Sequence, residues 1–222
     1  MQVLSEEARG KDVRSSHRDP ICQDIVAVCQ RLYQRGFIVG TEGNVSVRVA
    51  PDRIWITPSG CHKGLLQPEE LLLIDTAGHV CVGHGKASSE MPMHLTLYGC
   101  RPDIQAVVHA HPPIATALTV AGYSLETALL PEAVVALGEV PTVPYQLPTT
   151  WEFAQAVGEA MRQAVAALLE NHGSVTIGAS LQAAFNTMET LERVAQVFYL
   201  AQTLGRVHAL PTAAVEALRR LR

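Results

Sequence analysis

At the centre of the chain lies the stretch Val107-Val108-His109-Ala110-His111-Pro112, in which two apolar residues lead into a His-x-His pair. Successive side chains of an extended strand alternate between its two faces, so His109 and His111 point the same way. Two imidazoles on one face make half of a metal site. The pattern alone is equally compatible with one core histidine and one solvent-facing histidine, so the rest of the chain has to supply the remaining ligands.

The composition limits the class of protein. The chain has 222 residues, 48% of them hydrophobic, which is enough for one sizeable core. We therefore expect a single domain over residues 1–222, with residues 1–18 as a flexible polar arm. The net charge of −4 comes from mixed charges without a basic stripe, which argues against a nucleic-acid partner. The sequence has neither a signal-peptide pattern nor an apolar run near the ~20 residues that span a bilayer, so we expect no membrane partner and a cytoplasmic location.

The cysteines are scattered and show no Cys-x-x-Cys spacing. This pattern favours neither a disulfide framework nor a zinc ribbon. It predicts instead that the cysteines are small buried apolar residues, and this applies to all five, Cys22, Cys29, Cys61, Cys81 and Cys100.

Three helices have clear start or stop signals. Asp19-Pro20 begins a helix that Gly36 ends, since aspartate is a preferred N-cap and glycine a preferred stop. Thr150 begins a second helix, in which apolar residues recur at helical spacing as far as Leu168. A long helix is predicted over residues 180–204.

Strand signals lie mainly in the first half of the chain. Residues 44–49 alternate as a strand and are expected to pair with 53–56 as a hairpin, and 71–75 form a further short strand. Residues 123–149 are rich in proline and lack periodicity, which suits the wall of an active site or a subunit contact better than core.

Three short polar segments are candidates for holding an anion. Gly43-Asn44 precedes the predicted hairpin and Thr57-Pro58-Ser59-Gly60 follows it, so pairing of the hairpin would bring the two turns together. Ser88-Ser89 precedes a helical run whose unpaired N–H groups could bind a phosphate. Each segment also has an ordinary explanation, because Gly and Asn suit hairpin turns and either serine can cap the helix.

Glu90 and His172 are candidates for the missing metal ligands. Glu90 lies at the predicted helix start, and His172 stands in the tight turn Asn171-His172-Gly173, where a side chain can point away from the core. Together with His109 and His111 they provide three imidazoles and a carboxylate, a donor set that suits a tetrahedral Zn²⁺ ion and also accepts Mn²⁺ or Co²⁺. His94 shares a helix face with Glu90 and is expected to pack beside the site rather than to bind metal.

In this order, the segments resemble the motifs of the class II aldolase/adducin family, of the L-fuculose-1-phosphate aldolase type. The resemblance extends from residue 20 to about residue 205, and five ordered motifs are far more specific than any one of them. The matching segments are 43–46, 57–60, 88–90, 109–112 and 171–173.

The resemblance implies an α/β fold with three layers, α/β/α, around a central, largely antiparallel sheet, and a homotetramer with active sites at subunit interfaces. It implies that His109, His111 and His172 ligate Zn²⁺, with Glu90 as a ligand that substrate displaces and as the catalytic acid/base. It further implies a sugar phosphate as substrate, with its phosphate bound by Gly43, Asn44, Ser59, Gly60, Ser88 and Ser89.

The activity that follows is cleavage of a ketose 1-phosphate to dihydroxyacetone phosphate and an aldehyde. The metal stabilises the enediolate as a Lewis acid, and Glu90 returns a proton to it. In one respect the chain departs from the family's aldolases, which place a tyrosine from a neighbouring subunit over the aldehyde oxygen. The corresponding stretch, Thr127-Ala128-Leu129-Leu130-Pro131-Glu132, contains no tyrosine, and Tyr123, Tyr145 or Glu132 are possible substitutes.

Several alternatives use the same site. A methylthioribulose-1-phosphate dehydratase, a sugar-phosphate 4-epimerase or a decarboxylase would need the same metal and phosphate ligands. Epimerases of the family usually carry Asp in place of Glu90, which favours an aldolase or a dehydratase. A non-catalytic adducin-like interaction domain is an alternative of another class, although such domains lack the metal ligands that are present here.

Overall fold

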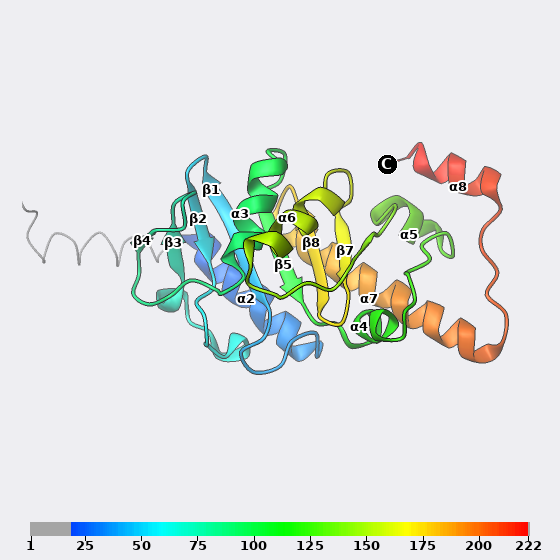
Figure 1. The fold of residues 1–222 in the computed structure, drawn as a ribbon, viewed down its shortest axis with the longest axis horizontal. Helices are drawn as coiled ribbons and strands as arrows, with labels where there is room; N and C mark the ends of the chain where they lie inside the picture. The colour runs from blue at the N-terminus through cyan, green and yellow to red at the C-terminus, as the bar shows by residue number, and fades with distance from the viewer. Residues whose placement is uncertain (1–18, 222) are drawn as a thin grey trace, which may run out of the picture.

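The computed structural model describes residues 19–221, and the predicted arm at residues 1–18 lies outside that range (Figure 1). The described strands form one eight-stranded sheet in the order β4-β3-β2-β1-β5-β8-β7-β6. Only β6 and β7 pair in parallel, so the prediction of a largely antiparallel sheet is confirmed. The strands are β1 (Asn44–Ala50), β2 (Arg53–Ile56), β3 (Leu72–Ile74), β4 (Val80–Val82), β5 (Ala106–Ala110), β6 (Thr142–Val143), β7 (Ala166–Leu169) and β8 (Gly173–Gly178).

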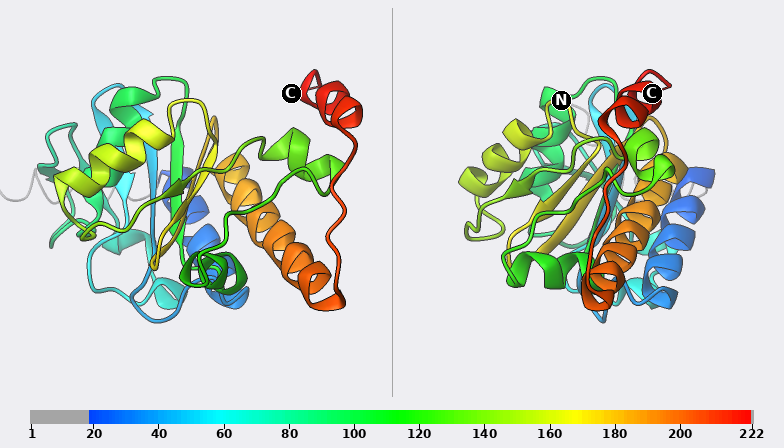
Figure 2. Two further views of the ribbon diagram at one scale, coloured as in Figure 1. Left: turned by 45° about the vertical axis from the view of Figure 1, so that its right-hand side comes forward. Right: turned by 90° about the vertical axis from the view of Figure 1, so that its right-hand side faces the viewer.

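Helices cover both faces of this sheet, which confirms the predicted three layers (Figure 2). One face carries α2 (Pro20–Gln34) and the long α7 (Leu181–Leu204), and the other carries α3 (Met91–Cys100) and α6 (Trp151–Ala160). The remaining helices, α4 (Pro113–Val120), α5 (Pro131–Ala136) and α8 (Thr212–Arg219), lie toward the β6–β7 edge and the C-terminus, and two short 3₁₀ turns, η1 (Lys63–Leu65) and η2 (Pro68–Glu70), follow β2.

The alternation of side chains along the strands explains the layers. Val45 and Val47 of β1 belong to the core under α2 and α7, whereas Val107 of β5 belongs to the core under α3 and α6. Residues two apart on a strand share a face, so His109 faces the α3 side together with Val107. The metal-site candidates therefore lie on the α3 side of the sheet.

The register of the sheet brings the first turn to the His-x-His strand. Asn44 of β1 pairs with His109 of β5, and Ser46 pairs with Val107. Gly43, just before β1, has a φ of +67°, and a Cβ there would lie 2.9 Å from the carbonyl oxygen of His109. Only a glycine allows this close approach without strain, so Gly43 has a structural role at the site.

The helix predicted from Thr150 to Leu168 is too long. Thr150 is the N-cap, as predicted, and accepts a hydrogen bond from the Phe153 amide at 3.2 Å, but α6 ends at Ala160 and residues 166–169 form β7. Strand β7 is buried on both faces, and the periodicity of a short, wholly apolar run cannot distinguish a helix from a buried strand.

Two smaller predictions also need correction. The N-cap of α3 is Glu90 rather than a serine, and Ser88 instead accepts a hydrogen bond from the Glu90 amide at 3.3 Å. Cys22 and Cys29 are buried as predicted, but Cys61 and Cys100 are only partly buried and Cys81 is exposed. Cys81 lies on β4, the edge strand, which has solvent on one side.

Among the described helices, none combines the length and the apolar character that a membrane crossing requires.

Candidate active site

Three of the predicted ligands form one cluster. The ligand atoms of His109, His111 and His172 all lie within 4.8 Å of one another, a group that could hold a metal ion. His109 comes from the end of β5, His111 from the residue just after it, and His172 from the turn between β7 and β8. Because β5 and β8 are neighbours in the sheet, two segments more than 60 residues apart meet at this end of it.

The geometry of the turn brings His172 into the cluster. Asn171 has a φ of +55°, a left-handed conformation that asparagine adopts more readily than most residues, and its amide is held by Thr119 Oγ1 of α4 at 3.1 Å. At Gly173 a Cβ would lie 2.5 Å from the Ala110 carbonyl oxygen and 2.6 Å from His111 Cδ2. The glycine in the predicted Asn-His-Gly motif is thus required for the close approach of the turn to His111.

Glu90 lies against the three imidazoles. Its Oε2 is 3.1 Å from His109 Nε2, and its Oε1 is 3.4 Å from His172 Nε2. The Nε2 atoms of His109 and His111 are 3.1 Å apart. The Nε2 atoms of His109 and His172 therefore flank one carboxylate, which is 8% exposed, and that of His111 lies beside His109 Nε2.

In two of the three histidines, the other ring nitrogen, Nδ1, has a partner on the side away from the cluster. His109 Nδ1 donates to the Ser174 carbonyl oxygen at 2.9 Å, and His111 Nδ1 lies 3.3 Å from Glu42 Oε2. Such partners fix the orientation of metal-binding histidines and leave Nε2 free to bind. His172 Nδ1 is buried and has no hydrogen-bond partner.

This donor set fits a divalent cation. A carbonyl oxygen can only accept, so His109 Nδ1 carries a hydrogen and Nε2 of the neutral ring presents its lone pair to His111 and Glu90. Lone pairs and a carboxylate that face one another repel unless a positive charge lies between them. In addition, Glu90 Oε1 is buried without a hydrogen-bond partner, as expected for an atom that faces a ligand.

Without a cation, the positive charge that the site requires falls on His109 itself, as the directions of the pKa shifts indicate. Burial, together with the positive charge of a protonated His109, lowers the pKa of His111 to about 3 and that of His172 to about 4. Both rings are therefore neutral at pH 7 and present lone pairs. Burial alone would raise the pKa of Glu90, but the charge and hydrogen bond of His109 outweigh it and hold that pKa well below its usual range, while Glu90 raises the pKa of His109.

A buried chain of hydrogen bonds supports Glu90 from the other side. Asn44 Nδ2 donates to Glu90 Oε2 at 2.8 Å, and Asn44 Oδ1 accepts from His94 Nε2. His94 Nδ1 then accepts from Ser46 Oγ at 2.6 Å, and Ser46 Oγ accepts from the Tyr98 hydroxyl at 2.9 Å. Burial lowers the pKa of His94 to about 3, so this ring is neutral, as the polarity of the chain requires.

The predicted anion-binding segments lie next to one another. The Ser88 amide donates to the Thr57 carbonyl oxygen at 3.1 Å, the Ser59 amide donates to the Lys86 carbonyl oxygen at 2.9 Å, and Pro58 and Ala87 form a β-bridge. The Val45 amide donates to Thr57 Oγ1 at 3.3 Å. Hydrogen bonds therefore join all three segments, either directly or through Asn44 and Glu90. The Ser59 amide already donates to Lys86, so it is not free to bind an anion.

Sequence reasoning missed several residues of this site. Glu42 behind His111 lies in a glycine-flanked turn, and nothing in its spacing marks it as a partner of a histidine. Ser174 acts through its backbone carbonyl, which leaves no trace in the residue type. Ser46 and Tyr98 could have been found from the i, i+2 and i, i+4 spacing that places them beside Asn44 and His94.

A cavity of about 780 Å³ lies elsewhere, between the 125–141 segment, the end of α6 and α8. None of the predicted site residues lines it, so it is separate from the histidine cluster.

The fold and site define the class of protein: the chain belongs to the class II aldolase/adducin family. The family's sequence model, the Class II Aldolase and Adducin N-terminal domain, matches residues 23–199. The L-fuculose phosphate aldolase of Methanococcus maripaludis strain C5 is 34% identical over 182 residues, 82% of this chain and 97% of that protein. The 3-oxo-tetronate 4-phosphate decarboxylase of Escherichia coli K12 is 35% identical over 182 residues, 80% of this chain and 85% of that protein.

A solved structure agrees with this assignment. YgbL from Escherichia coli superposes with a TM-score of 0.85 at 32% sequence identity, over 90% of this chain and 98% of that one. The predicted family and fold are therefore confirmed, and membership of the family supports an enzyme that acts on a sugar phosphate.

Proposed function

We propose that this protein is a Zn²⁺-dependent aldolase that cleaves a ketose 1-phosphate, of the L-fuculose 1-phosphate kind, to dihydroxyacetone phosphate and an aldehyde. The observation that carries this proposal is the cluster of three imidazoles, two of which have Nε2 within 3.4 Å of the Glu90 carboxylate. The similarity to a named L-fuculose phosphate aldolase over most of both chains supports it.

His109, His111 and His172 would hold the metal, with Glu90 as a further ligand until substrate arrives. When bound there, a divalent ion would act as a Lewis acid and stabilise the negative charge that develops on the substrate. Imidazole also accepts Mn²⁺ and Co²⁺, and Zn²⁺ is proposed because it favours sites with three histidines and one exchangeable position.

Glu90 would move the proton. In the cleavage, the bond between C3 and C4 of the ketose breaks, its electrons stay with C3 as an enediolate, and the C4 hydroxyl loses its proton as the aldehyde forms. C3 then takes up a proton to complete dihydroxyacetone phosphate. Glu90 Oε1 has no hydrogen-bond partner, while Oε2 is held by Asn44 and His109, so Oε1 is the atom that we assign to proton transfer.

The phosphate would bind at the three joined segments, through Gly43, Asn44, Ser59, Gly60, Ser88 and Ser89. Ser59, Gly60 and Ser89 are exposed, and Ser88 Oγ, which accepts from the Glu90 amide, keeps its own proton to donate. Asn44 uses one hydrogen of its amide for Glu90, so only the second is available to a ligand. Hydroxyl and backbone donors of this kind suit the oxygen atoms of a phosphate.

Cleavage also needs a group that accepts the proton of the C4 hydroxyl and returns it to the aldehyde oxygen in the reverse direction, and the stretch around Glu132 lacks the family's tyrosine for this role. Tyr123 and Tyr145 are 51% and 56% exposed, which leaves both accessible to a neighbouring subunit in a homotetramer. We propose these two as the candidates. The homotetramer, the single domain over residues 1–222 and the cytoplasmic location remain predictions.

A decarboxylase is the second candidate, favoured by two observations. The decarboxylase relative is as similar as the aldolase relative, and the chain lacks the tyrosine that serves the aldehyde. Loss of CO₂ from a 3-oxo acid phosphate leaves an enediolate of the same kind and requires a proton only at carbon. Such a reaction needs Glu90 but no group that accepts a proton from a C4 hydroxyl.

The deciding experiment uses purified, Zn²⁺-loaded protein with L-fuculose 1-phosphate, related ketose 1-phosphates and 3-oxo-tetronate 4-phosphate. The aldolase proposal expects dihydroxyacetone phosphate and one equivalent of aldehyde from a ketose 1-phosphate. Release of CO₂ with dihydroxyacetone phosphate from the 3-oxo acid alone would replace it with the decarboxylase. Dehydration or epimerisation without cleavage would show as a new sugar phosphate of equal carbon number.

The adducin-like alternative is tested by metal analysis of the wild type and of His109→Ala. The enzyme proposal expects about one ion per chain in the wild type and a strong loss in the variant. Equal metal in both, or none in either, would support an interaction domain.

A further inference from the structure

Lys63 is a buried lysine beside the anion-binding segments. It begins η1, three residues after Gly60, and is 2% exposed. Its Nζ donates to the Thr41 carbonyl oxygen at 3.2 Å and to the Cys61 carbonyl oxygen at 3.1 Å. Thr41 precedes the Gly43-Asn44 turn and Cys61 follows Gly60, so the ammonium lies between two segments that adjoin these turns.

Among the described residues, no carboxylate forms an ion pair with this ammonium. Removing a charged amine from water is costly, and two neutral carbonyl oxygens offset only part of that cost. Buried lysines are usually paired with a negative charge. An anion in the neighbouring turns would supply the missing counter-charge.

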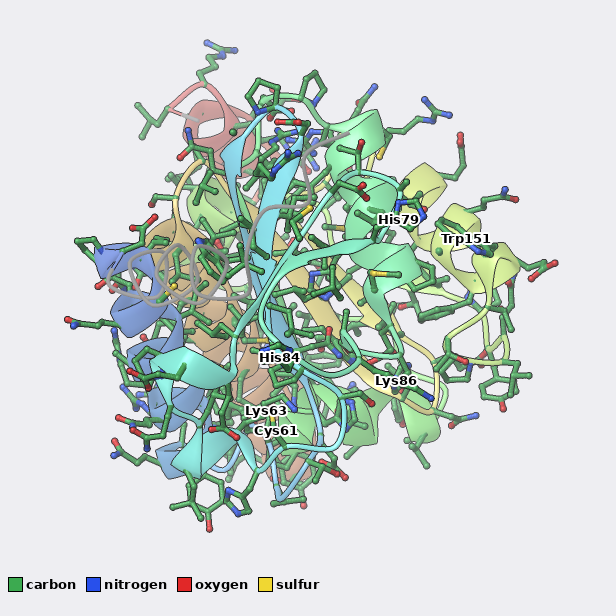
Figure 3. All side chains as sticks on the ribbon, turned by 90° about the vertical axis from the view of Figure 1, so that its left-hand side faces the viewer. Cys61, Lys63, His79, His84, Lys86 and Trp151 are labelled. Atoms are coloured by element: carbon green, nitrogen blue, oxygen red, sulfur yellow. The ribbon has the colours of Figure 1, made fainter. Side chains whose placement is uncertain are left out.

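The surrounding segments reinforce the positive charge. Residues 57–64 and 83–89 are joined by the Ser59–Lys86 hydrogen bond and the Pro58–Ala87 bridge, and together they contain two lysines and no acidic residue, with Glu42 and Glu90 outside them. Figure 3 shows Cys61, Lys63, His84 and Lys86 in the lower part of one face of the molecule. Lys86 is exposed, so Lys63 carries the positive charge that solvent screens least.

We infer that Lys63 is the fixed counter-charge of a phosphate dianion bound by these turns, and that it selects phosphorylated over unphosphorylated substrates. This inference rests on the proposed function and adds a specificity-determining residue to it. Lys63 acts as a positioning residue as well, because its two carbonyl contacts hold the turns together. A neutral substrate gains nothing from the buried charge, whereas a dianion is attracted to it and relieves the cost of burying it.

The test compares wild-type protein, Lys63→Met and Lys63→Gln, each loaded with Zn²⁺ and titrated with inorganic phosphate. Methionine fills the space without charge, and glutamine keeps N–H donors for the carbonyls, also without charge. We expect at least ~10-fold weaker phosphate binding in both variants. We also expect the wild type to gain several degrees in Tm with phosphate and the variants to gain little, while the phosphate-free Tm of Lys63→Gln stays near that of the wild type.

Lys86→Met is the matched control, because it removes an exposed cation from the same pair of segments. Its effect on phosphate binding should be small and should disappear at high salt, whereas that of Lys63→Met should persist. With a ketose phosphate, loss of Lys63 should raise KM by the factor seen for phosphate binding and leave kcat nearly unchanged.

Wild-type phosphate affinity in both Lys63 variants, or a wild type that does not bind phosphate, would overturn the inference. A phosphate-free Tm lowered in both variants, with phosphate binding retained, would show that Lys63 is only a structural link between the turns. These results are separable from the proposed reaction. If the Lys63 variants bind phosphate as the wild type does and the wild type cleaves its substrate, the Lys63 inference alone is rejected. If phosphate binding depends on Lys63 but the wild type cleaves no ketose phosphate, the aldolase proposal alone is rejected.

Discussion

Asn44 donates a hydrogen bond of 2.8 Å from its side-chain amide to Glu90 Oε2. A carboxylate cannot donate in return, so this contact fixes the orientation of the amide and turns its oxygen toward His94. His94 must then donate from Nε2 and accept at Nδ1, where Ser46 is the donor. The orientation of Glu90 is thereby linked to α3 and to the sheet through Asn44 and the buried side chains of His94, Ser46 and Tyr98.

Replacement of His94 by phenylalanine should therefore impair catalysis without direct loss of a ligand. Asn44 would lose the donor that holds its oxygen, and an unsatisfied buried hydrogen bond costs ~1–3 kcal/mol, enough for a fall in kcat of ~10-fold or more. Steady-state kinetics with metal analysis would measure this, with metal content unchanged. Tyr98→Phe is the control, because Tyr98 is four hydrogen bonds away from Glu90 and its loss should have a smaller effect. Equal kcat in His94→Phe and wild type would contradict the proposed support of Glu90 by His94.

Glu90→Gln separates proton transfer from metal binding. Glutamine keeps the shape of the side chain and cannot accept a proton, so kcat should fall by ~10²–10⁴-fold. The three imidazoles remain, and about one metal ion per chain should be retained. Retained activity with full metal content would assign the acid/base role to another residue.

Glu42→Gln tests the support of His111. The carboxylate lies 3.3 Å from His111 Nδ1, and loss of such a partner usually lowers metal affinity by ~10–100-fold. Competition with a chelator would measure the affinity. The matched control is Glu139→Gln, whose carboxylate pairs with Arg219 on the surface instead and should leave metal affinity unchanged.

Gly173→Ala should disturb the metal cluster through sterics alone. The added Cβ would lie 2.5 Å from the Ala110 carbonyl oxygen and 2.6 Å from His111 Cδ2, so the turn and the ligand have to move apart. We expect metal content to fall well below one ion per chain, together with a lower Tm. Gly99→Ala on α3 has open space around its new Cβ and should be neutral or stabilising by up to ~1 kcal/mol. A Gly173→Ala protein with full metal content would show that the turn can adapt.

Acid should destabilise the metal-free protein. The pKa values of His94 and His111 are lowered to about 3 and that of His172 to about 4, all primarily by burial. In the unfolded chain these histidines take up protons below pH ~6.5, whereas in the folded protein they do so only near pH 3–4. The unfolded state therefore binds more protons in this window, and the free energy of unfolding falls as the pH drops from about 6.5 toward 4.

The raised pKa of His109 acts in the opposite direction, but it is one group against three. Urea unfolding of metal-free protein at several pH values would measure the slope. His172→Gln removes one of the three groups and should flatten it. Constant or rising stability on acidification of the wild type would contradict the buried, neutral histidines.

Sequence patterns were reliable where one short segment determines its own structure. The N-caps at Asp19 and Thr150 and the hairpin of β1 and β2 follow from local residue types, and the structure confirms them. The prediction for residues 165–169 was wrong, because an apolar run of that length is compatible with a helix and with a strand buried on both faces. Only the position of β7 inside the sheet decides between the two.

The sequence by itself determined which residue types are present for chemistry: a His-x-His pair that must share one face of a strand, a histidine in a glycine turn, and a glutamate at a helix start. Their meeting at one point was decided by the tertiary structure, since only strand order and register place β8 beside β5 and Asn44 opposite His109. The partners behind the ligands, Glu42, the Ser174 carbonyl and the buried Lys63, also required the fold. The physical reason is that contacts of backbone carbonyls and long-range charge pairs depend on position in space and leave no periodic signal along the chain.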